Sequence, residues 1–449
     1  MVRLLYVIKN AKLFIGGEFI EGSIVIEGRI IKALTKDEVK YVGKADKVFD
    51  AKGLPLIPGG IDIHAHIYDP DYIHHEDFIT GTTAAAFGGI TTVFDMPLRM
   101  YVDDPSKFDI KLKEGLRNSL VNFGIHAGMM NEKNWFNIEK LAYKGVIGFK
   151  IFTCKPFKSS DEGIIRIMEE LKRFNRVAFV HAEDDLLIDL GLEAVKGRSD
   201  PLAHHEARSD VAEAVAINRV IMFGKNVGVH VHIAHVSSGL GAEMIRVAKS
   251  LKINVTAETC PQYLYFSRDD VVRFGNYLKI TPSLKNKDDV RALWEAVKDG
   301  TIDAIASDHA PAPREEKEVG VWEAWGGIPV IELIIPFMYT FGVKRGYIDF
   351  KRFVEVISAG PAKSMHIYPQ KGSERPGSDA DLVVLDVNTC RKVKASELHH
   401  KVDWCPFEGI EMCGWPLHVF VCGEPIVLDR ELVGKPGVGK YVGILPFES

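Results

Sequence analysis

Two histidines close a short apolar run near the start of the chain. His64 and His66 end the segment Gly59-Gly60-Ile61-Asp62-Ile63-His64-Ala65-His66. In a β-strand, side chains at i and i+2 point to the same face, and their Cα atoms lie roughly 6.5–7 Å apart. Neutral imidazole readily binds divalent metals, so both rings can reach one ion at the strand end. An isolated pair of this kind is more often two ordinary core or surface histidines, so the rest of the chain must decide.

Four further residues that can bind or serve a metal stand at the ends of later apolar runs. They are Lys150, His181, His235 and Asp308. Each alone would be interpreted as a satisfied core residue or a capping acid. Six such groups at matching strand ends are improbable by chance, so the sequence predicts that they converge on one metal site.

The elements that must position these residues alternate between strands and helices. Apolar runs predict eight parallel strands, over residues 61–66, 91–96, 123–129, 146–152, 177–181, 229–235, 253–258 and 302–308. Helical spacing of apolar residues falls between several of them, as in 161–174, 212–222 and 241–251, and Ser160 is a candidate N-cap. Eight strand–helix units in about 300 residues predict an α/β fold, a (β/α)₈ TIM barrel with its active site at the C-terminal ends of the strands. An open doubly wound sheet is the alternative.

Both ends of the chain read differently from this middle part. Residues 1–57 contain short predicted strands with tight turns, including a hairpin at Gly16-Gly17, and strands are again predicted at 380–386, 417–421 and 425–428. Residues 1–57 are too few to fold comfortably alone, and the strands at the other end are the expected partner. We therefore predict a composite β-sandwich from residues 1–57 and 369–449, around a barrel of residues 58–368.

Composition limits the classes of partner. A chain of 449 residues with 46% hydrophobic and 26% charged residues has the balance of a soluble enzyme, and a net charge of −5 offers no basic field for nucleic acid. No stretch predicts a membrane span or a signal peptide, which predicts a cytoplasmic protein. The six cysteines form no Cys-x-x-Cys pair, so reduced and mostly buried thiols are expected.

Lys150 is the unusual member of the predicted site, because a protonated amine is repelled by metal cations. It fits only as a neutral amine or after conversion to an anion. Here the sequence resembles the cyclic amidohydrolases, the group of dihydroorotases, hydantoinases (dihydropyrimidinases) and allantoinases. The resemblance rests on Pro58 to His66, Gly148-Phe149-Lys150, Val180-His181-Ala182-Glu183, Ala234-His235-Val236-Ser237-Ser238, Glu258-Thr259-Cys260-Pro261, Ser307-Asp308-His309-Ala310-Pro311 and Gly377-Ser378-Asp379-Ala380-Asp381-Leu382.

The resemblance implies a binuclear site with a hydroxide between two divalent ions, taken to be Zn²⁺. One ion is held by His64, His66, Lys150 and Asp308, and the other by Lys150, His181 and His235. Lys150 carries a carbamate derived from CO₂, which removes the charge conflict. Asp308 then acts as the base that takes the hydroxide proton and returns it to the leaving ring nitrogen, so that a cyclic amide is hydrolysed. Members of the group are commonly homo-oligomers, which predicts a dimer or tetramer.

The ring that is opened depends on other positions. Dihydroorotases carry an Arg and an Asn that hold the substrate carboxylate, where this chain has Tyr68 and Leu98. An anionic substrate without a positioned cation pays a large desolvation cost, unless Arg99, Lys155 or Lys285 compensates. Lys155 also replaces a Tyr of the hydantoinases.

Three segments look most like allantoinases, whose substrate is neutral: 80–92, 96–98 and 324–328. By analogy, Thr281 and Gly327 would hold the ring amide through backbone groups. We therefore predict ring opening of allantoin or a related hydantoin or ureide. Dihydroorotase or hydantoinase activity is the alternative, and a metal-free scaffold relative is a third hypothesis that the complete ligand set disfavours.

Two more histidines stand close to this set. His232 stands three residues before His235 in the same predicted strand and is interpreted as structural packing, with a role behind the metal ligands or at the substrate as the alternative. His309 follows Asp308 directly, so its side chain is expected to point away from the site.

Overall fold

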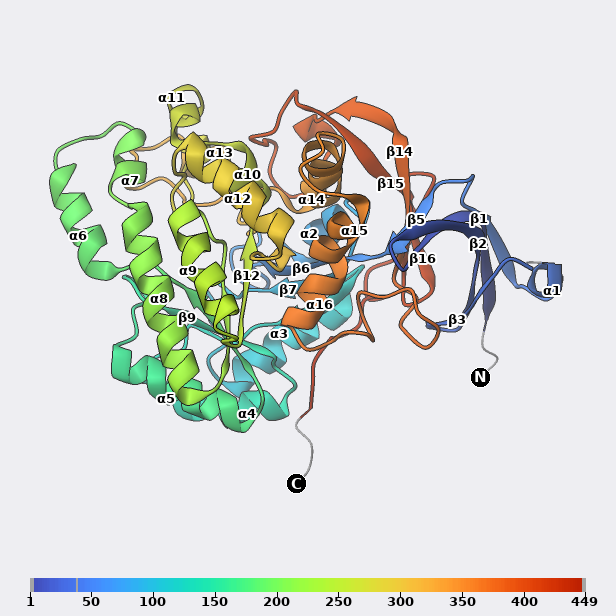
Figure 1. The fold of residues 1–449 in the computed structure, drawn as a ribbon, viewed down its shortest axis with the longest axis horizontal. Coiled ribbons are helices and arrows are strands. Elements are labelled where there is room, and N and C mark those ends of the chain that lie inside the picture. The colour runs from blue at the N-terminus through green and yellow to red at the C-terminus, as the bar shows by residue number, and fades with distance from the viewer. Residues whose placement is uncertain (1–3, 38, 446–449) are drawn as a thin grey trace.

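The computed structural model describes residues 4–37 and 39–445 of the chain, and the fold is a TIM barrel joined to a β-sandwich (Figure 1). Residues 1–3, 38 and 446–449 of the predicted sandwich segments lie outside the described residues. The helices of the barrel occupy one side of Figure 1, and the strands from both chain ends occupy the other.

The barrel contains all eight predicted strands. They form two parallel sheets, in the orders β6-β7-β8 and β13-β12-β11-β10-β9. Parallel bridges from Ala127 to Phe149 and from Ala65 to His309 join the two sheets at both seams, so the ring is closed. The open doubly wound alternative is therefore wrong. The strands are β6 (Gly60–Ala65), β7 (Ile90–Asp95), β8 (Asn122–Ile125), β9 (Gly148–Phe152), β10 (Val177–His181), β11 (His230–Ile233), β12 (Val255–Thr259) and β13 (Ala304–Ile305).

Helices between these strands pack their apolar faces on the barrel. The predicted helix at 161–174 is α5, and the Ser160 hydroxyl accepts from the Gly163 amide as an N-cap. Its buried residues Ile164, Ile167 and Leu171 follow helical spacing. The helices are α2 (Phe78–Phe87), α3 (Pro105–Asn118), α4 (Ile138–Tyr143), α5 (Asp161–Arg173), α6 (Asp185–Ala194), α7 (Leu202–Glu206), α8 (Asp210–Val227), α9 (Gly239–Ser250), α10 (Pro261–Tyr265), α11 (Val271–Phe274), α12 (Lys287–Asp299), α13 (Arg314–Lys317), α14 (Ile334–Phe337), α15 (Phe350–Val354) and α16 (Gly360–Ser364), with α1 (Val39–Val42) before the barrel.

The two chain ends share one nine-stranded sheet, in the order β17-β16-β15-β14-β5-β1-β2-β3 with β4 paired to β1. Strand β5 joins the ends, because it pairs with β1 on one side and with β14 on the other. Predicted hairpin residues Gly16 and Gly17 connect β1 to β2. The strands are β1 (Leu5–Ile15), β2 (Glu18–Glu27), β3 (Ile30–Thr35), β4 (Lys47–Asp50), β5 (Pro55–Pro58), β14 (Leu382–Lys392), β15 (Glu411–Val421), β16 (Glu424–Leu428) and β17 (Glu431–Leu432).

The last described residues leave the sandwich and run along the barrel. The Phe123 amide donates to the Lys440 carbonyl, and the Val442 amide donates back to the Phe123 carbonyl. Ile444 continues this contact, since its amide donates to Gly145 and its carbonyl accepts from Arg176. These residues fall in the segment 369–449, which the sequence assigns to the sandwich. The domain boundaries at 57/58 and 368/369 remain a prediction.

The cysteines differ from the expectation of reduced thiols. Cys390 and Cys413 form a disulfide, because the antiparallel pairing of β14 with β15 puts them opposite each other with Cα atoms 4.1 Å apart. The register shifts between Asp386 and Cys390, so the sequence alone could not align the two cysteines. The other four cysteines are free and buried: Cys154, Cys260, Cys405 and Cys422.

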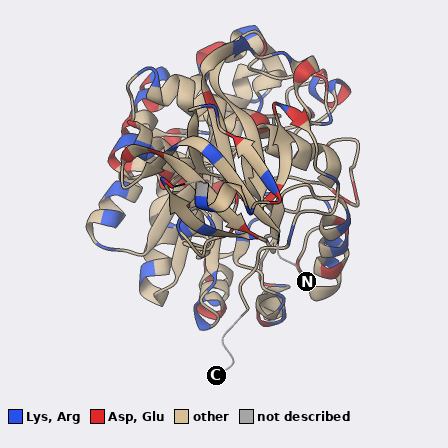
Figure 2. Cartoon of the chain, turned by 90° about the vertical axis from the view of Figure 1, so that its right-hand side faces the viewer, with Lys and Arg blue, Asp and Glu red and all other residues tan. Residues whose placement is uncertain are grey.

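Charged residues are mixed over the surface rather than collected by sign. In Figure 2, Lys and Arg alternate with Asp and Glu along the helices in view. Among the described residues, no helix combines the length and the apolar character that crossing a bilayer requires.

Candidate active site

Six predicted side chains meet at one mouth of the barrel. They stand at or just beyond the C-terminal ends of β6, β9, β10, β11 and β13, where parallel strands of a barrel present their last residues. A cavity of about 400 Å³ opens there. Its lining includes all six: His64, His66, Lys150, His181, His235 and Asp308.

One half of this cluster centres on the carboxylate of Asp308. Its Oδ1 lies 3.4 Å from His64 Nε2 and 3.3 Å from His66 Nε2. The amine of Lys150 lies 3.5 Å from the same nitrogen of His64. Two ring nitrogens and a carboxylate oxygen lie within 4.8 Å of one another, and His64, His66 and Asp308 therefore form a group that could hold a divalent cation.

The other half consists of His181 and His235. The Nδ1 atom of His181 lies 3.0 Å from Nε2 of His235, and the two rings meet edge to face. Burial lowers the pKa of both imidazoles, so both are neutral. Two neutral ring nitrogens directed at each other in a buried site fit a shared metal ion, since neutral imidazole is the binding form.

The tautomer of His181 is fixed from behind. Its Nε2 atom lies 2.9 Å from the carboxylate of Glu183, which also forms an ion pair with Arg208. Burial alone raises the pKa of Glu183, but Arg208 and His181 outweigh it and bring the pKa to about 2. A charged Glu183 accepts the proton on Nε2 and leaves the lone pair on Nδ1 facing His235.

The two histidines of β6 are oriented in the same way. His64 contacts Glu258 of β12 through Nδ1 at 2.5 Å, and His66 donates from Nδ1 to the Met96 carbonyl at 2.7 Å. In each ring Nε2 is left facing Asp308. Acceptors on the outer nitrogens therefore set which nitrogen each ring offers to the cavity.

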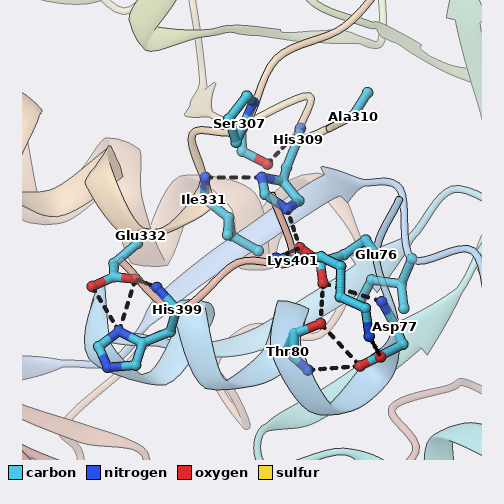
Figure 3. Close-up of polar contacts among 12 residues, drawn as sticks. Glu76, Asp77, Thr80, Ser307, His309, Ala310, Ile331, Glu332, His399 and Lys401 are labelled. Carbon is cyan, nitrogen blue, oxygen red and sulfur yellow. Dashed lines mark hydrogen bonds and ion pairs between the residues drawn. The ribbon is translucent and has the colours of Figure 1, made fainter. Parts of the chain in front are cut away.

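Asp308 is held by the residues on either side of it. Its own amide donates to the His64 carbonyl at 2.9 Å, and its φ of 48° is in the left-handed region. The Ser307 hydroxyl bonds to buried Asp62. His309 points away as expected, and its Nε2 lies 3.0 Å from Glu76 (Figure 3). The chain on both sides of Asp308 is thus fixed, and the carboxylate is aimed at the two histidines.

His232 lies behind the site rather than in it. Its ring is fully buried, with Nδ1 2.8 Å from the Thr256 hydroxyl and Nε2 3.3 Å from Glu258. It touches the carboxylate that orients His64 and does not line the cavity. The position agrees with structural packing that supports a site residue.

The predicted substrate-contact residues are distributed unequally. Leu98 and Thr281 line the cavity as predicted. Gly327 does not line it: its neighbour Gly326 does, and the Gly327 carbonyl accepts a hydrogen bond from Lys317. Tyr68 is buried and packs beside the His66 ring.

The three cations considered as replacements for the missing arginine are engaged elsewhere. Arg99 lies over the rings of Tyr72 and Trp325. Lys155 lines the cavity but binds Asp189 at 2.6 Å. Lys285 donates to the Arg208 and Ser283 carbonyls.

Several cavity residues were not found by reasoning from the sequence. They lie beyond the strand ends, in loops or in α6 and α7, where no pattern in the sequence marks a residue as functional: Phe157, Leu192, His204, Arg208, Lys279 and Trp322. Glu183 and Glu258 belong to motifs quoted above, but their role in orienting histidines was not recognised. Their position at or beyond a strand end was the available signal.

Comparison with known proteins decides the family. The sequence model of the protein family described as 'Amidohydrolase family' matches residues 56–426. The chain belongs to the amidohydrolase family. It is 32% identical to an L-hydantoinase of Paenarthrobacter aurescens over 99% of both chains, and 33% identical to a dihydroorotase of Methanosarcina mazei over 97% of both.

Two further similarities concern a named activity and the fold. An allantoinase of Enterococcus faecalis is 31% identical over 97% of this chain and 98% of its own. The solved structure of an L-hydantoinase from Arthrobacter aurescens superimposes with a TM-score of 0.94, at 32% identity and over 98% of this chain and 99% of that one. The predicted membership of the cyclic amidohydrolase group is confirmed, and the chain is an enzyme of this metal-dependent family.

We predict that Glu258→Gln weakens the site without unfolding the protein. Glutamine has the same shape, but it replaces one of the two carboxyl oxygens that face His64 and His232 with an NH₂ group, and loss of such a partner typically costs 10–100-fold in metal affinity or activity. Hydrolytic kcat/KM and bound metal should be measured together. Glu243→Gln, on an exposed face of α9, is the matched control. Unchanged metal content and activity in Glu258→Gln would contradict the orienting role.

Proposed function

We propose that the cavity holds two divalent ions, Zn²⁺ in the first instance. His64, His66 and Asp308 would bind one ion, and His181 and His235 the other, with Lys150 between the two groups. The contacts of Asp308 with two ring nitrogens and the 3.0 Å approach of His181 to His235 support this assignment. The outer ring nitrogens of His64, His66 and His181 contact Glu258, the Met96 carbonyl and Glu183, as those of metal-binding histidines do.

We further propose that Lys150 is carbamylated. Burial lowers the pKa of its amine to about 8, which favours the neutral form that reacts with CO₂. The neutral amine forms a bond to the carbon of CO₂ and releases one proton, which leaves a carbamate with one negative charge. Starting from the ammonium form, two protons are released in all. This step removes the repulsion between Lys150 and bound cations, and its two oxygens suit a bridging position.

When bound, a pair of divalent ions supplies an activated water and polarises the carbonyl of the substrate. Asp308 supplies the proton transfers. Its side chain is 14% exposed and has Oδ1 near two histidines, which leaves a second oxygen to take the proton of the attacking water. The same oxygen then returns the proton to the ring nitrogen that leaves as the amide bond breaks.

The substrate that the geometry supports best is a neutral hydantoin-type ring, as in allantoin. The observation that supports this choice is that Arg208, Lys155 and Lys279, which line the cavity, are already engaged with protein groups. Arg208 is paired with Glu183, and Lys155 with Asp189. Lys279 donates to the carbonyls of Trp322 and Ala324, and burial lowers its pKa to about 8.

A second candidate is a hydantoin with an apolar substituent. Several residues that line the cavity are apolar, and such a lining favours an apolar group over the polar ureido group of allantoin. The residues are Leu98, Met129, Phe152, Phe157, Leu192 and Trp322. The similarity to an L-hydantoinase supports this candidate, and the similarity to an allantoinase supports the first.

Dihydroorotate fits less well. Among the described residues that line the cavity, only cations already engaged with protein groups are available for its carboxylate, apart from Lys150 in the proposed metal site. A metal-free scaffold is disfavoured because the six side chains converge. The homo-oligomeric state and the cytoplasmic location stay predictions.

Lys150→Ala should remove bound metal. Without the bridging carboxylate, both ion positions lose a ligand, so the purified variant is expected to hold far less metal than the wild type, which should hold about two ions per chain. Metal analysis by mass spectrometry checks this. Lys155→Ala, at an exposed lysine of the same cavity, should keep its metal. Full metal content in Lys150→Ala would exclude the bridging role.

Asp308→Asn should abolish turnover with the fold kept, because an amide cannot accept the proton of water. The expected loss in kcat is at least 100-fold, the scale of general acid–base catalysis. Circular dichroism and melting temperature report the fold, and Asp403→Asn at an exposed site is the control. Near-normal hydrolysis would refute the assigned role.

A substrate panel tests the choice of ring. Allantoin, 5-benzylhydantoin, dihydrouracil and dihydroorotate should be compared by the rate of ring opening. We expect the two hydantoin rings to be opened at least 10-fold faster than dihydroorotate. A preference for dihydroorotate would overturn the proposal of a neutral substrate, and the ratio of the first two compounds separates the two candidates.

A further inference from the structure

A second group of metal-binding side chains lies outside the catalytic cavity. His74 and His75 precede α2, early in the barrel segment of the chain. Glu316 lies in α13, which follows the last barrel strand. Nε2 of His75 is 2.8 Å from Glu316 Oε1, and Nε2 of His74 is 3.4 Å from the same oxygen. None of the three residues lines the cavity described above.

We propose that His74, His75 and Glu316 form an additional site for a divalent ion of the Zn²⁺ class. Two imidazoles and one carboxylate are a ligand set that zinc accepts, with water in the fourth position. Bonds of about 2.1 Å in a tetrahedron put neighbouring ligand atoms about 3.4 Å apart. The His74–Glu316 separation has this value, and the His75–Glu316 contact has to open by about half an ångström.

The backbone that presents the two histidines is already fixed. Glu76, the next residue, binds the His309 ring at 3.0 Å and accepts from the Lys401 amide (Figure 3). Asp77 caps α2 through the Thr80 amide and pairs with Lys401. A site whose supporting residues are held by such contacts pays little ordering cost on binding an ion.

The backbone around Glu316 is held in place by hydrogen bonds as well. Its carbonyl accepts from the Trp325 amide at 2.8 Å. Buried Lys317, the next residue, donates to the carbonyls of Trp325 and Gly327. The Trp325 ring in turn packs edge to face against His75.

The three side chains differ in solvent exposure, and the exposed ones would allow an ion to enter from solvent. The His74 side chain is 56% exposed and Glu316 is 37% exposed, while His75 is fully buried. An ion held here would link the segment before α2 to α13. Through Lys317 and Trp325, that link reaches the chain beside Gly326 in the cavity wall. The site therefore clamps two connecting segments at the mouth of the barrel.

The test is ion uptake by the holoenzyme. Wild-type protein, with its catalytic metal loaded, is dialysed against micromolar free Zn²⁺, and the metal per chain is compared in His74→Gln, Glu316→Gln and the control Glu315→Gln. Glu315 is the exposed neighbour of Glu316 on α13. The wild type and the control should bind one ion more per chain than the other two variants.

Melting temperature gives a second readout, because an ion that binds only the folded state stabilises it by an amount that grows with the free ion concentration relative to the dissociation constant. Added Zn²⁺ should raise the melting temperature in the wild type and in Glu315→Gln more than in His74→Gln. Equal uptake by the wild type and both ligand variants would overturn the proposal, as would no uptake beyond the catalytic metal. These comparisons measure bound metal and melting temperature in variants of one protein, so their outcome does not depend on which substrate the enzyme uses.

Discussion

The structure depends on how buried imidazoles are kept neutral with one chosen nitrogen facing the cavity. Removing a ring from water lowers its pKa, and an uncompensated N–H or lone pair in such a place is costly. The barrel meets this cost with acceptors behind the rings: Glu258 for His64, the Met96 carbonyl for His66 and Glu183 for His181. Glu258 and Met96 belong to other strands or their ends, so closure of the barrel determines the direction of the lone pairs of His64 and His66, while Glu183 sets that of His181 from the same strand end.

Much of this could be predicted from the sequence, because strands repeat every two residues. The alternation in 61–66 puts His64 and His66 on one face, and apolar runs locate all eight strands of the barrel. The same rule puts His309 on the opposite side from Asp308, where it binds Glu76. Groups whose position follows from strand direction and strand end are therefore the ones that the sequence finds.

Other features depend on register or on connecting segments, which carry no such period. Cys390 faces Cys413 only because β14 and β15 pair with a shifted register, and residues 437–445 turn from the sandwich to the barrel. Arg208 reaches Glu183 from a segment between two helices. These contacts are set by tertiary packing, so no local pattern reveals them.

Residues at the strand ends and residues in the segments that follow them have different roles in the cavity. The strand ends supply the histidines, the lysine and the aspartate, whereas the cavity wall comes largely from the segments that follow the strands, as with Phe157, Leu192 and Trp322. Relatives named hydantoinase, dihydroorotase and allantoinase therefore share nearly equal identity with this chain, between 31% and 33%. Overall identity thus does not distinguish the three activities, and the proposal of a neutral substrate rests on the engaged cations and the apolar side chains of the cavity.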